Sequence, residues 1–536
     1  MTESSNAIQK ELPKTNSTIM RVDLTSGKIT KEMVDPSDEE KYIGGMGVGT
    51  AIFTREVSPD TDAFDPENLL IISVGPFTGT AVPFNGRHFI TSKSPLTELI
   101  GEASSGGYFA KELATSGINH LIIKGKSEKP VYLWVHDEDV EIRDAKDLWG
   151  KKTSDTESAI KNELGNDKVK IASIGPAGEN LVRYASIMNE EDRAAGRCGL
   201  GAVMGSKKLK AIAVKGSGKA PVANKDELRE VVKEIQEMVK DSLLAGVFSN
   251  YGTVSNYSNE AIGDVPVKNY TMSRWKGNKK LGSEKWKKKR TGTHGCYACP
   301  VRCTGLVDFN GKKVRWPEYE TVASMGSNLM VADLDALIKW NVLVNDLGMD
   351  TISLGACIAG LLEAIEKKLI KLDKTTLGFK TGEEPWGNLN AIEKIISMIA
   401  RREGIGDDLA NGIKEFVEKY DLPAEMATHG KGLEVPMHEP RANDMTALDY
   451  FTTNRGAYHC YLPMAVSSNM NLKKDIDITG MVDRFCTFSM DNLPAKNKAT
   501  WVVIKLQDSS EAYSACGGCI FGFQFLDVVK PWVKAY

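Results

Sequence analysis

Cysteines in two separate clusters are the feature that most constrains how this chain can fold. Cys296, Cys299 and Cys303 lie in one short stretch, where their thiols can converge on a single soft metal centre. Cys516 and Cys519 lie near the C-terminal end and can supply a fourth thiolate. A fold that uses four thiolates must therefore bring two distant parts of the sequence together.

The spacing of these cysteines favours one class of metal centre. Four thiolates are the usual ligands of an iron–sulfur cluster or of a structural zinc ion. Zinc modules usually supply two short pairs of ligands, whereas this chain has a triplet and a distant fourth thiol. The triplet spacing is also the reverse of that expected for a radical enzyme that uses S-adenosylmethionine. We therefore predict an iron–sulfur cluster, with zinc and no metal as the alternatives.

Composition excludes several other classes of protein. The chain has 536 residues, of which 41% are hydrophobic, and this length predicts two to four domains. The formal net charge is −3, so no nucleic-acid partner is indicated. Nine cysteines in this length do not suggest a disulfide scaffold, and clustered thiols indicate a reducing compartment. The N-terminus is polar and no apolar run reaches about 18 residues, so we expect a cytoplasmic protein without a membrane partner.

The pattern of apolar residues predicts an α+β fold. Short apolar runs bounded by Gly and Pro predict a β-rich domain over residues 1–215. Apolar residues then recur at helical spacing, which predicts two mainly helical domains over residues 216–380 and 381–536. The expected strands cover 69–74, 120–123, 131–135, 169–174 and 211–215, and the expected helices cover 154–164, 225–244 with an N-cap at Asn224, 333–347, 352–368, 390–402, 412–419 and 500–516.

The β-rich part contains four loops dense in Gly and Ser. Glycine lets backbone amides approach an anionic ligand, because no Cβ lies in the way. One such loop is usually only a turn, but four in one domain, with Arg87 and Arg193 beside two of them, predict a cofactor that carries phosphate. The loops cover residues 44–49, 75–80, 104–107 and 194–201, and none is a dinucleotide fingerprint or a Walker-type loop.

Several polar residues of the helical part are candidates for chemistry. Glu318 and Glu320 follow the cysteine triplet, and a carboxylate buried there would have a raised pKa suited to a general base. The alternative is an exposed helix N-terminus. Asn345 and Asp350 flank a glycine that is expected to end a helix, and they could hydrogen-bond a heterocycle. His459 follows a basic turn, where a structural role is the alternative to a catalytic one.

The motifs resemble, in order and over nearly the whole chain, those of the aldehyde:ferredoxin oxidoreductase family of tungsten enzymes. One motif would be weak support, but this many in the same order are strong support. They are Tyr42-Ile43-Gly44-Gly45, Gly75-Pro76-Phe77-Thr78-Gly79-Thr80, Lys93-Ser94-Pro95-Leu96-Thr97, Arg193-Ala194-Ala195-Gly196-Arg197, the cysteine triplet, Pro317-Glu318-Tyr319-Glu320, Leu347-Gly348-Met349-Asp350-Thr351-Ile352-Ser353 and Asn454-Arg455-Gly456.

The resemblance implies three cofactors. They are tungsten, or molybdenum, held by the dithiolenes of two pyranopterins; a [4Fe–4S] cluster; and Mg²⁺ that bridges the pterin phosphates. The N-terminal domain would form the base for the pterins, with the two helical domains over them. By motif position, the cluster ligands would be Cys296, Cys299, Cys303 and Cys519, and the cofactor-binding residues would be Arg87, Ser104, Gly106, Arg193, Ala194, Gly196, Asn345, Met349, Asp350, Ser514 and Ile520, with the main-chain carbonyls of Ser104 and Ala194 toward Mg²⁺.

The resemblance also implies an activity. Glu320 and His459 match the pair beside the open face of the metal, where Glu320 would accept a proton from water or an aldehyde hydrate. His459 would polarise the carbonyl or relay the proton. The electrons would pass through the cluster to ferredoxin or another iron–sulfur carrier, and an acidic carrier could dock on the Lys-rich run 285–290, unless that run is only a solvated loop. A homodimer or a complex with an electron-transfer subunit is also expected.

The chain departs from the family pattern in several places. Asn345 and Ser514 stand where the two pterin motifs usually begin with aspartate, and Ser104 stands where asparagine is usual. Cys516 and the two glycines after it replace a more apolar stretch. The chain ends soon after Cys519, which is expected of a fragment or of a shortened variant.

Other functions remain as alternatives. One is reduction of an aromatic-ring thioester, for which relatives usually place a cysteine near the metal; Cys357 is the candidate, unless it is a core residue. Reduction of a carboxylate or of sulfur is another. An iron–sulfur electron-transfer or scaffold subunit without metallopterin is the alternative of a different class.

Overall fold

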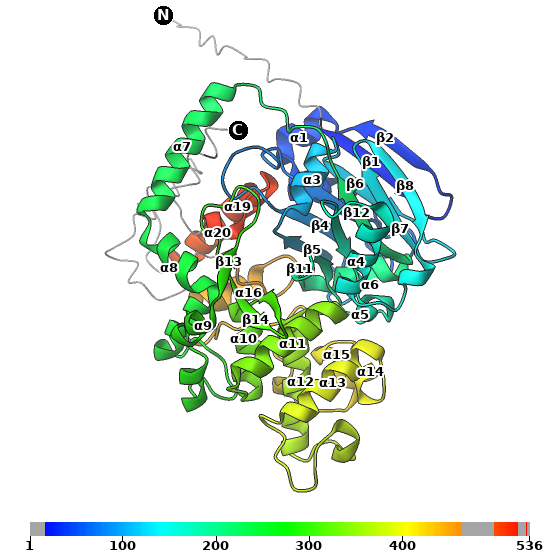
Figure 1. Cartoon of the computed structure of the whole chain (residues 1–536). Helices are drawn as coiled ribbons and strands as arrows, with labels where there is room; N and C mark the ends of the chain where they lie inside the picture. The colour runs from blue at the N-terminus through cyan, green and yellow to red at the C-terminus, as the bar shows by residue number, and fades with distance from the viewer. Residues whose placement is uncertain (1–16, 462–497, 524–531, 533–536) are drawn as a thin grey trace, which may run out of the picture.

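The computed structural model describes residues 17–461, 498–523 and Trp532. Two sheets make up the N-terminal part, and most of the chain after them is helical (Figure 1). The predicted α+β fold class, with its β-rich part first, is therefore confirmed. The domain limits at residues 215 and 380 stay predictions.

The described strands and α-helices have these bounds. The strands are β1 (Thr18–Asp23), β2 (Ile29–Met33), β3 (Leu70–Val74), β4 (His88–Lys93), β5 (Ile100–Ser105), β6 (His120–Lys124), β7 (Val131–His136), β8 (Asp139–Asp144), β9 (Lys170–Ser173), β10 (Ile187–Asn189), β11 (Arg193–Ala195), β12 (Leu209–Lys215), β13 (Gly292–His294), β14 (Thr304–Phe309), β15 (Lys312–Arg315), β16 (His429–Gly430) and β17 (Leu433–Glu434). The helices are α1 (Pro36–Tyr42), α2 (Gly45–Glu56), α3 (Phe109–Thr115), α4 (Thr153–Leu164), α5 (Pro176–Glu179), α6 (Leu200–Ser206), α7 (Lys225–Asp241), α8 (Leu243–Tyr251), α9 (Ser283–Lys289), α10 (Tyr319–Met325), α11 (Leu334–Leu347), α12 (Thr351–Glu366), α13 (Leu389–Arg401), α14 (Ile405–Leu409), α15 (Ile413–Lys419), α16 (Asp444–Thr452), α19 (Lys498–Ala515) and α20 (Ile520–Phe523).

The two N-terminal sheets are mixed. Within the described residues, one has the order β2-β1-β6-β3-β4-β5 and the other the order β11-β10-β9-β12-β7-β8. β1 pairs with β6 in parallel, and β7 pairs with β12 in parallel, whereas the other neighbours are antiparallel. Every residue of β3 is buried, as expected for a continuous apolar run covered on both faces. The carboxyl end of β5 and the short β11 carry two of the glycine-rich loops toward the helical part.

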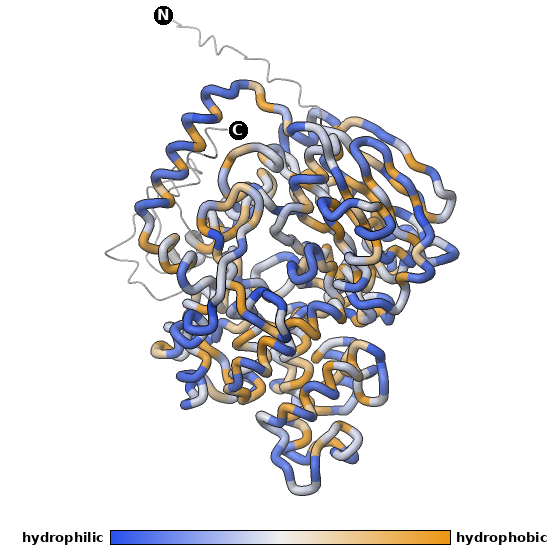
Figure 2. The backbone as a smooth tube through the Cα atoms, in the orientation of Figure 1, coloured by the Kyte–Doolittle hydropathy of each residue, from blue (hydrophilic) through white to orange (hydrophobic). Residues whose placement is uncertain are grey.

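The helices begin and end where local chemistry predicts. Asn224 accepts hydrogen bonds from the amides of the first turn of α7, and Asp333 does the same for α11. Gly348 ends α11 with φ of 75°, a left-handed conformation that glycine adopts without strain. Figure 2 shows hydrophilic and hydrophobic residues alternating along α7, which buries Val231 and Ile235.

One expected helix is divided in two. The apolar pattern predicts a helix over 225–244, but α7 ends at Asp241 and α8 begins at Leu243. Ser242 between them has extended backbone angles, and its side chain accepts a hydrogen bond from the amide of Ala245. Ser242 is therefore the N-cap of a new helix. Its side chain competes with the backbone carbonyls of α7 for the next amides, and apolar spacing does not reveal this competition.

The C-terminal helix packs on the N-terminal part through glycine. A Cβ on Gly45 would lie 2.6 Å from the carbonyl oxygen of Ala515, and one on Gly75 would lie 2.2 Å from the carbonyl carbon of Cys516. Figure 1 shows α19 and α20, in red, beside the blue N-terminal elements. Backbone atoms can approach this closely only where no side chain intervenes, so the glycines set the position of residues 515–517.

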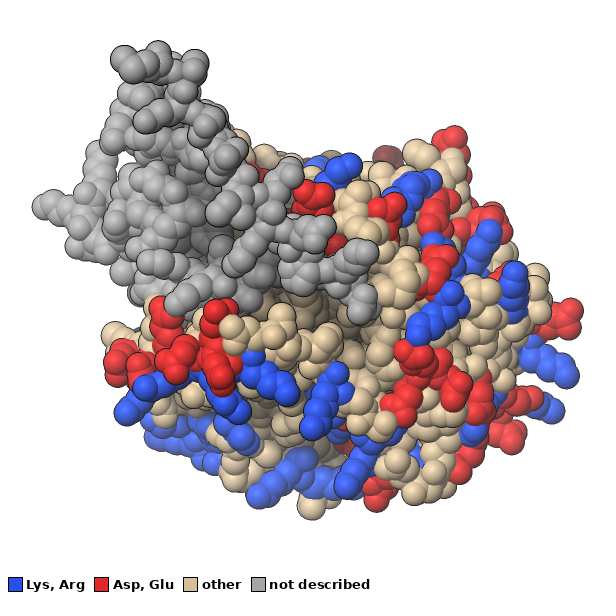
Figure 3. Space-filling view, turned by 90° about the horizontal axis from the view of Figure 1, so that it is seen from above, with Lys and Arg blue, Asp and Glu red and all other residues tan. Residues whose placement is uncertain are grey.

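Two observations concern the charges on one face and the apolar character of the helices. Figure 3 shows basic and acidic side chains interspersed on the described part of the face seen from above. Among the described helices, none combines the length and the apolar character that crossing a membrane requires.

Candidate functional site

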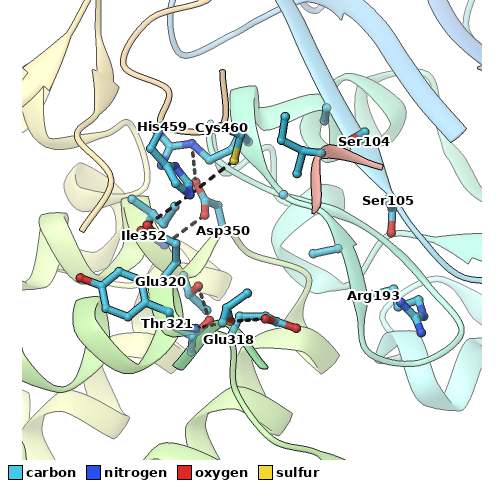
Figure 4. Close-up of a pocket in the computed structure, with 18 of the residues that line it drawn as sticks. Ser104, Ser105, Arg193, Glu318, Glu320, Thr321, Asp350, Ile352, His459 and Cys460 are labelled. Carbon is cyan, nitrogen blue, oxygen red and sulfur yellow. Dashed lines mark hydrogen bonds and ion pairs between the residues drawn. The ribbon is translucent and has the colours of Figure 1, made fainter. Parts of the chain in front are cut away.

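A cavity of about 340 Å³ lies between the sheets and the helical part. This volume is within the range of small-molecule and cofactor sites. Figure 4 shows Glu320 and His459 on its helical side, across from Ser104, Ser105 and Arg193 of the N-terminal part. The predicted site residues that line it are Arg87, Ser104, Gly106, Arg193, Ala194, Gly196, Glu320, Asn345, Met349, Asp350, His459 and Ile520. Ser514 lines a smaller neighbouring cavity that shares Arg87, Ser104 and Ile520.

Backbone hydrogen bonds tie the two cysteine segments together. The amide of Cys519 donates to the carbonyl of Phe84 over 2.8 Å, and the amide of Phe84 donates to the carbonyl of Ala298 over 3.4 Å. Ala298 lies between Cys296 and Cys299 in the sequence. Phe84 therefore connects the triplet loop to the C-terminal segment, although the two are far apart in the chain.

The thiols share one electrostatic environment with two arginines. The Nη1 atom of Arg193 donates to the sulfur of Cys296 over 3.0 Å. Burial works to lower the pKa of Arg87, but the charges of Cys519 and Cys296 outweigh it and raise that pKa. Burial, together with the charges of Cys296 and Cys519, raises the pKa of Cys299 to about 12. These half-buried thiols need a positive centre nearby to be stable as thiolates.

The spacing of the sulfur atoms bears on the choice of metal. A single Zn²⁺ with 2.3 Å bonds holds tetrahedral sulfurs about 3.8 Å apart. In the described part of the chain, the His, Cys, Asp and Glu side chains that gather in threes within 4.8 Å are Glu320, His438 and His459, and the cysteines do not meet that limit. The described cysteine sulfurs are therefore spaced more widely than one zinc ion requires.

The walls of the cavity beside the cysteines suit an anionic group. Arg87 Nε, Ser105 Oγ and Arg197 Nη1 are buried and have no hydrogen-bond partner among the described residues. A Cβ on Gly196 would meet Ala194, Asp350 and Ser186 no closer than 3.8 Å, so no tight contact requires glycine at this position of the cavity wall. Cationic and hydroxyl donors around open space are what a phosphate-bearing cofactor requires.

Only two of the four glycine-rich loops line this cavity. Residues 104–107 and 194–201 contribute lining residues, whereas 44–49 and 75–80 contribute none. The latter two loops instead pack against the end of α19. Met46 of the first of these loops also lines the smaller cavity beside Ser514. Close backbone packing needs glycine as much as ligand binding does, so glycine-rich loops alone do not show which loops approach a cofactor.

Glu320 and His459 form a pair within the cavity. Glu320 lies in the first turn of α10, and its Oε2 atom accepts a hydrogen bond from the amide of Met437 over 2.8 Å. Its Oε1 atom lies 3.3 Å from Nε2 of His459. Burial raises the pKa of Glu320 despite the nearby charge of His438, and burial with the charge of His438 lowers the pKa of His459 well below its usual value. The alternative of an exposed helix N-terminus therefore does not hold for Glu320.

Sequence reasoning missed other residues of this pair's surroundings. Nε2 of His438 lies 3.7 Å from Oε1 of Glu320, and Nδ1 of His438 lies 2.8 Å from Oδ2 of Asp264. Arg197 and Arg455 also line the cavity. Histidine is rare in this chain, which has only seven, and this rarity was the available signal that His438 could belong to the site.

Cys460, rather than Cys357, is the cavity-lining cysteine on the helical side. Its sulfur lies 3.4 Å from Nε2 of His459. Cys357 is buried in α12 with its sulfur 3.9 Å from Glu434 Oε1, and it does not line the cavity. The interpretation of Cys357 as a core residue is the one that its position supports.

Asp449 of α16 makes stability depend on pH. Its Oδ1 atom accepts from Gln507 over 2.7 Å, while burial raises its pKa to about 7, above the usual value of about 4. Between about pH 4 and about pH 7 the folded chain holds a proton on Asp449 that the unfolded chain has already lost. The contribution of Asp449 to the stability of the fold is therefore complete below about pH 4 and is lost as the pH rises through about 7. We expect Asp449→Asn to raise the free energy of unfolding by about 2–4 kcal/mol at pH 8 and to have little effect at pH 4.

Thermal unfolding midpoints measured across this pH range check the Asp449 prediction. Asp226→Asn is the matched control, because the Asp226 side chain is 89% exposed on α7. The same gain at both pH values, or an equal gain in the control, would contradict the assignment of the effect to Asp449.

Comparison with known protein families gives two matches that together span most of the chain. Residues 19–216 match the model described as aldehyde ferredoxin oxidoreductase, N-terminal domain. Residues 230–535 match the model described as aldehyde ferredoxin oxidoreductase, domains 2 and 3. Both N-terminal and helical parts are therefore covered by one family.

Individual relatives agree with these matches. A protein of Pyrococcus furiosus named tungsten-containing aldehyde ferredoxin oxidoreductase is 40% identical over 511 residues, which cover 94% of this chain and 81% of that protein. The protein of the same name from Thermococcus kodakarensis is 39% identical over 510 residues, with the same coverage of 94% and 81%. An aliphatic sulfonate oxidoreductase, WOR-like subunit, of Pyrococcus furiosus is 32% identical over 468 residues, covering 81% of this chain and 72% of that protein.

A solved structure shares the fold. It is the active site complex BamBC of benzoyl coenzyme A reductase with 1,5-dienoyl-CoA, matched with a TM-score of 0.77 and 27% identity over 94% of this chain and 81% of that chain. The relatives thus carry different activities on a common architecture.

Proposed function

The chain belongs to the aldehyde ferredoxin oxidoreductase family, and on this premise we propose that it oxidises aldehydes to carboxylic acids. The electrons pass to ferredoxin or another iron–sulfur carrier. The observation that carries the proposal is the half-buried pair Glu320 and His459, which lines a cavity whose wall residue Arg193 donates a hydrogen bond to Cys296 on its other side. This oxidation requires that the protein supply groups that transfer protons and a path by which electrons leave the site.

The cofactor set is inferred from the donors that the chain offers. Cys296, Cys299, Cys303 and Cys519 would hold a [4Fe–4S] cluster. Arg87, Arg193 and the loop atoms around Ser104, Gly106, Ala194 and Gly196 would hold the phosphates of two pyranopterins and their Mg²⁺, and Asn345, Met349, Asp350, Ser514 and Ile520 would contact the pterins. When bound, the tungsten–pterin group, or its molybdenum counterpart, supplies the two-electron oxidation and the cluster passes the electrons on singly.

The residues of the chain handle the protons of this reaction. An aldehyde and water yield a carboxylate, three protons and two electrons. Glu320 accepts a proton from the water or the aldehyde hydrate, because its Oε1 atom has no hydrogen-bond partner among the described residues. His459, neutral because its pKa is lowered by burial, donates a hydrogen bond to the carbonyl oxygen or relays the proton.

The partner and the direction of electron flow are also part of the proposal. Ferredoxin is named in the relatives, and the benzoyl coenzyme A reductase structure and the WOR-like subunit are named as parts of larger assemblies. We infer that this chain works with a one-electron carrier, either free or as an associated subunit.

Anaerobic purification followed by joint analysis of metals and pterin tests the proposal. We expect about four irons, about one tungsten or molybdenum and about two pterins per chain, with aldehyde-dependent reduction of a viologen dye. Iron without tungsten, molybdenum or pterin would contradict the enzyme and favour an electron-transfer subunit. Zinc alone would overturn the role given to the cysteines.

Reduction of an aromatic-ring thioester is the second candidate, favoured by one observation. Cys460 places a thiol on the cavity wall beside His459, 3.4 Å from its Nε2 atom. The same purified protein distinguishes the two activities. Turnover of an aromatic coenzyme A thioester with a strong reductant, without turnover of any aldehyde, would favour this candidate.

A further inference from the structure

An array of four side chains extends from the cavity into the protein, half-buried at His459 and Glu320 and buried at His438 and Asp264. His459 Nε2 lies 3.3 Å from Glu320 Oε1, which lies 3.7 Å from His438 Nε2, and His438 Nδ1 lies 2.8 Å from Asp264 Oδ2. His438 is only 7% exposed and Asp264 only 4%. The array therefore places two imidazoles and two carboxylates in alternation, in a part of the protein that water reaches poorly.

Four separate segments of the chain hold this array in place. Asp264 follows the 3₁₀ segment Gly252–Ile262, His438 follows β17, Glu320 belongs to α10 and His459 follows α16. The backbone around His438 is fixed as well. The carbonyl of Asp264 accepts from the amide of Glu439 over 2.9 Å, and the carbonyl of His438 accepts from Tyr450 Oη over 3.1 Å. The ring of His438 also packs against Tyr319, with centroids 4.9 Å apart.

We propose that His438, fixed by Asp264, is a positioning residue that presents a positive charge to the Oε1 atom of Glu320. It thereby keeps Glu320 ionised as the proton acceptor. This inference rests on the proposed function, in which Glu320 is the base. His438 acts through Glu320, and the residues that touch the substrate remain Glu320 and His459.

The electrostatics of the array agree with its geometry. Burial works to lower the pKa of His438, but Asp264 and Glu320 outweigh it and raise that pKa. Burial raises the pKa of Glu320, and His438 is the largest of the influences that lower it. The raised pKa of His438 favours a cation inside the array, and the lowered pKa of His459 favours a neutral ring at its cavity end. The other titratable groups that act on the array are Arg197, Tyr257, Tyr270, Tyr319, Asp350, Tyr450 and Cys460.

This arrangement addresses a difficulty of catalysis in a dry cavity. A buried carboxylate without a counter-charge becomes protonated, and a protonated carboxyl cannot accept another proton. A permanent cation such as arginine in direct contact would instead hold the carboxylate so firmly that it became a weak base. A histidine at 3.7 Å, whose own charge depends on a second carboxylate, gives an intermediate effect.

Two variants test the proposal, and both should move the pH dependence in the same direction. His438→Gln removes the positive charge, and Asp264→Asn removes the carboxylate that keeps His438 protonated. In each variant the pKa of Glu320 rises, so we expect the acidic limb of the pH profile of kcat/KM to move up by about one pH unit or more. Combining the two changes should add little to His438→Gln alone, because both act through the same charge.

A spectroscopic measurement decides the proposal independently of turnover. Carbon-13 labelling at Cε1 of the seven histidines gives few resonances, and His438→Gln identifies the one from His438. In the protein as purified, we expect that resonance to show a protonated imidazole at pH 7, and to titrate at least one pH unit lower in Asp264→Asn. His429→Gln, a substitution of a half-buried histidine outside the cavity, is the matched control for folding and activity.

The outcomes separate this inference from the proposed function. If His438 is neutral at pH 7, or if Asp264→Asn leaves its titration unchanged, the inference is overturned whether or not aldehydes are oxidised. A stoichiometric divalent metal that is lost on His438→Gln would also overturn it, since Nε2 would then be a ligand. If no aldehyde is oxidised but the titrations are as expected, only the substrate of the proposed function has failed.

Discussion

We expect Glu320→Gln to lower kcat for aldehyde oxidation by about 10²- to 10⁴-fold in protein that retains its metals and pterin. Glutamine has nearly the same shape, and its side-chain carbonyl can still accept the hydrogen bond from the amide of Met437. What it loses is the ability to take a proton. Because the substrate would still bind, KM should change much less than kcat.

A neighbouring carboxylate provides the control for this variant. Glu318 also lines the cavity, but its carboxylate accepts a hydrogen bond from Thr253. Glu318→Gln should keep activity within about tenfold of the parent, since a hydrogen-bonding role survives the substitution. Full activity in Glu320→Gln would remove Glu320 from the mechanism, and equal losses in both variants would indicate a structural cause.

The second large effect concerns the fourth cysteine. We expect Cys519→Ser to purify with less than about half of the parent's iron and to lose electron transfer to ferredoxin, because a four-iron cluster needs four ligands. Burial is the main cause of the raised pKa of Cys299 and Cys303, and the charge of Cys519 adds to it in both cases. Cys519 is therefore close enough to the triplet to act on two of its thiols. Burial raises the pKa of Cys516 to about 12, and no charge of a triplet cysteine contributes to that shift. We therefore do not assign Cys516 as a cluster ligand, and we expect Cys516→Ser to keep its iron.

These two cysteine variants control for each other. They lie in the same short segment and are both partly exposed, so a loss caused by general unfolding should affect both. Iron content, the visible absorption of the cluster and dye-linked activity can be measured on the same samples. Loss of iron in Cys516→Ser alone would make Cys516 the fourth ligand, and no loss in either would exclude the whole segment.

Much of the fold could be predicted because its elements carry their own signals. The apolar run at 70–74 is buried over its full length, and α11 begins and ends at the Asp and Gly that chemistry favours at those positions. The division of α7 and α8 at Ser242 could not be predicted from apolar spacing. It depends on one side chain that caps a helix instead of continuing one.

The candidate site was predictable where residue type and spacing are distinctive. Cys296, Cys299 and Cys303 could be grouped from the sequence, and Glu320 could be singled out beside them. His438 could not, because its partners Asp264 and Glu320 come from separate segments that only the fold brings together. Glycine gave a mixed signal for a physical reason: the absence of a side chain suits both a ligand and a neighbouring backbone.

The glycine contact of α2 and the residue after β3 with the end of α19 has a consequence for recombination between relatives. A Cβ on Gly45 or Gly75 would collide with main-chain atoms of residues 515–517. The contact therefore depends on glycine at these two positions and not on the side chains of residues 515–517. When the N-terminal sheets of one relative are joined to the helices of another, we expect folding where the first parent has glycine at both positions and failure where it does not.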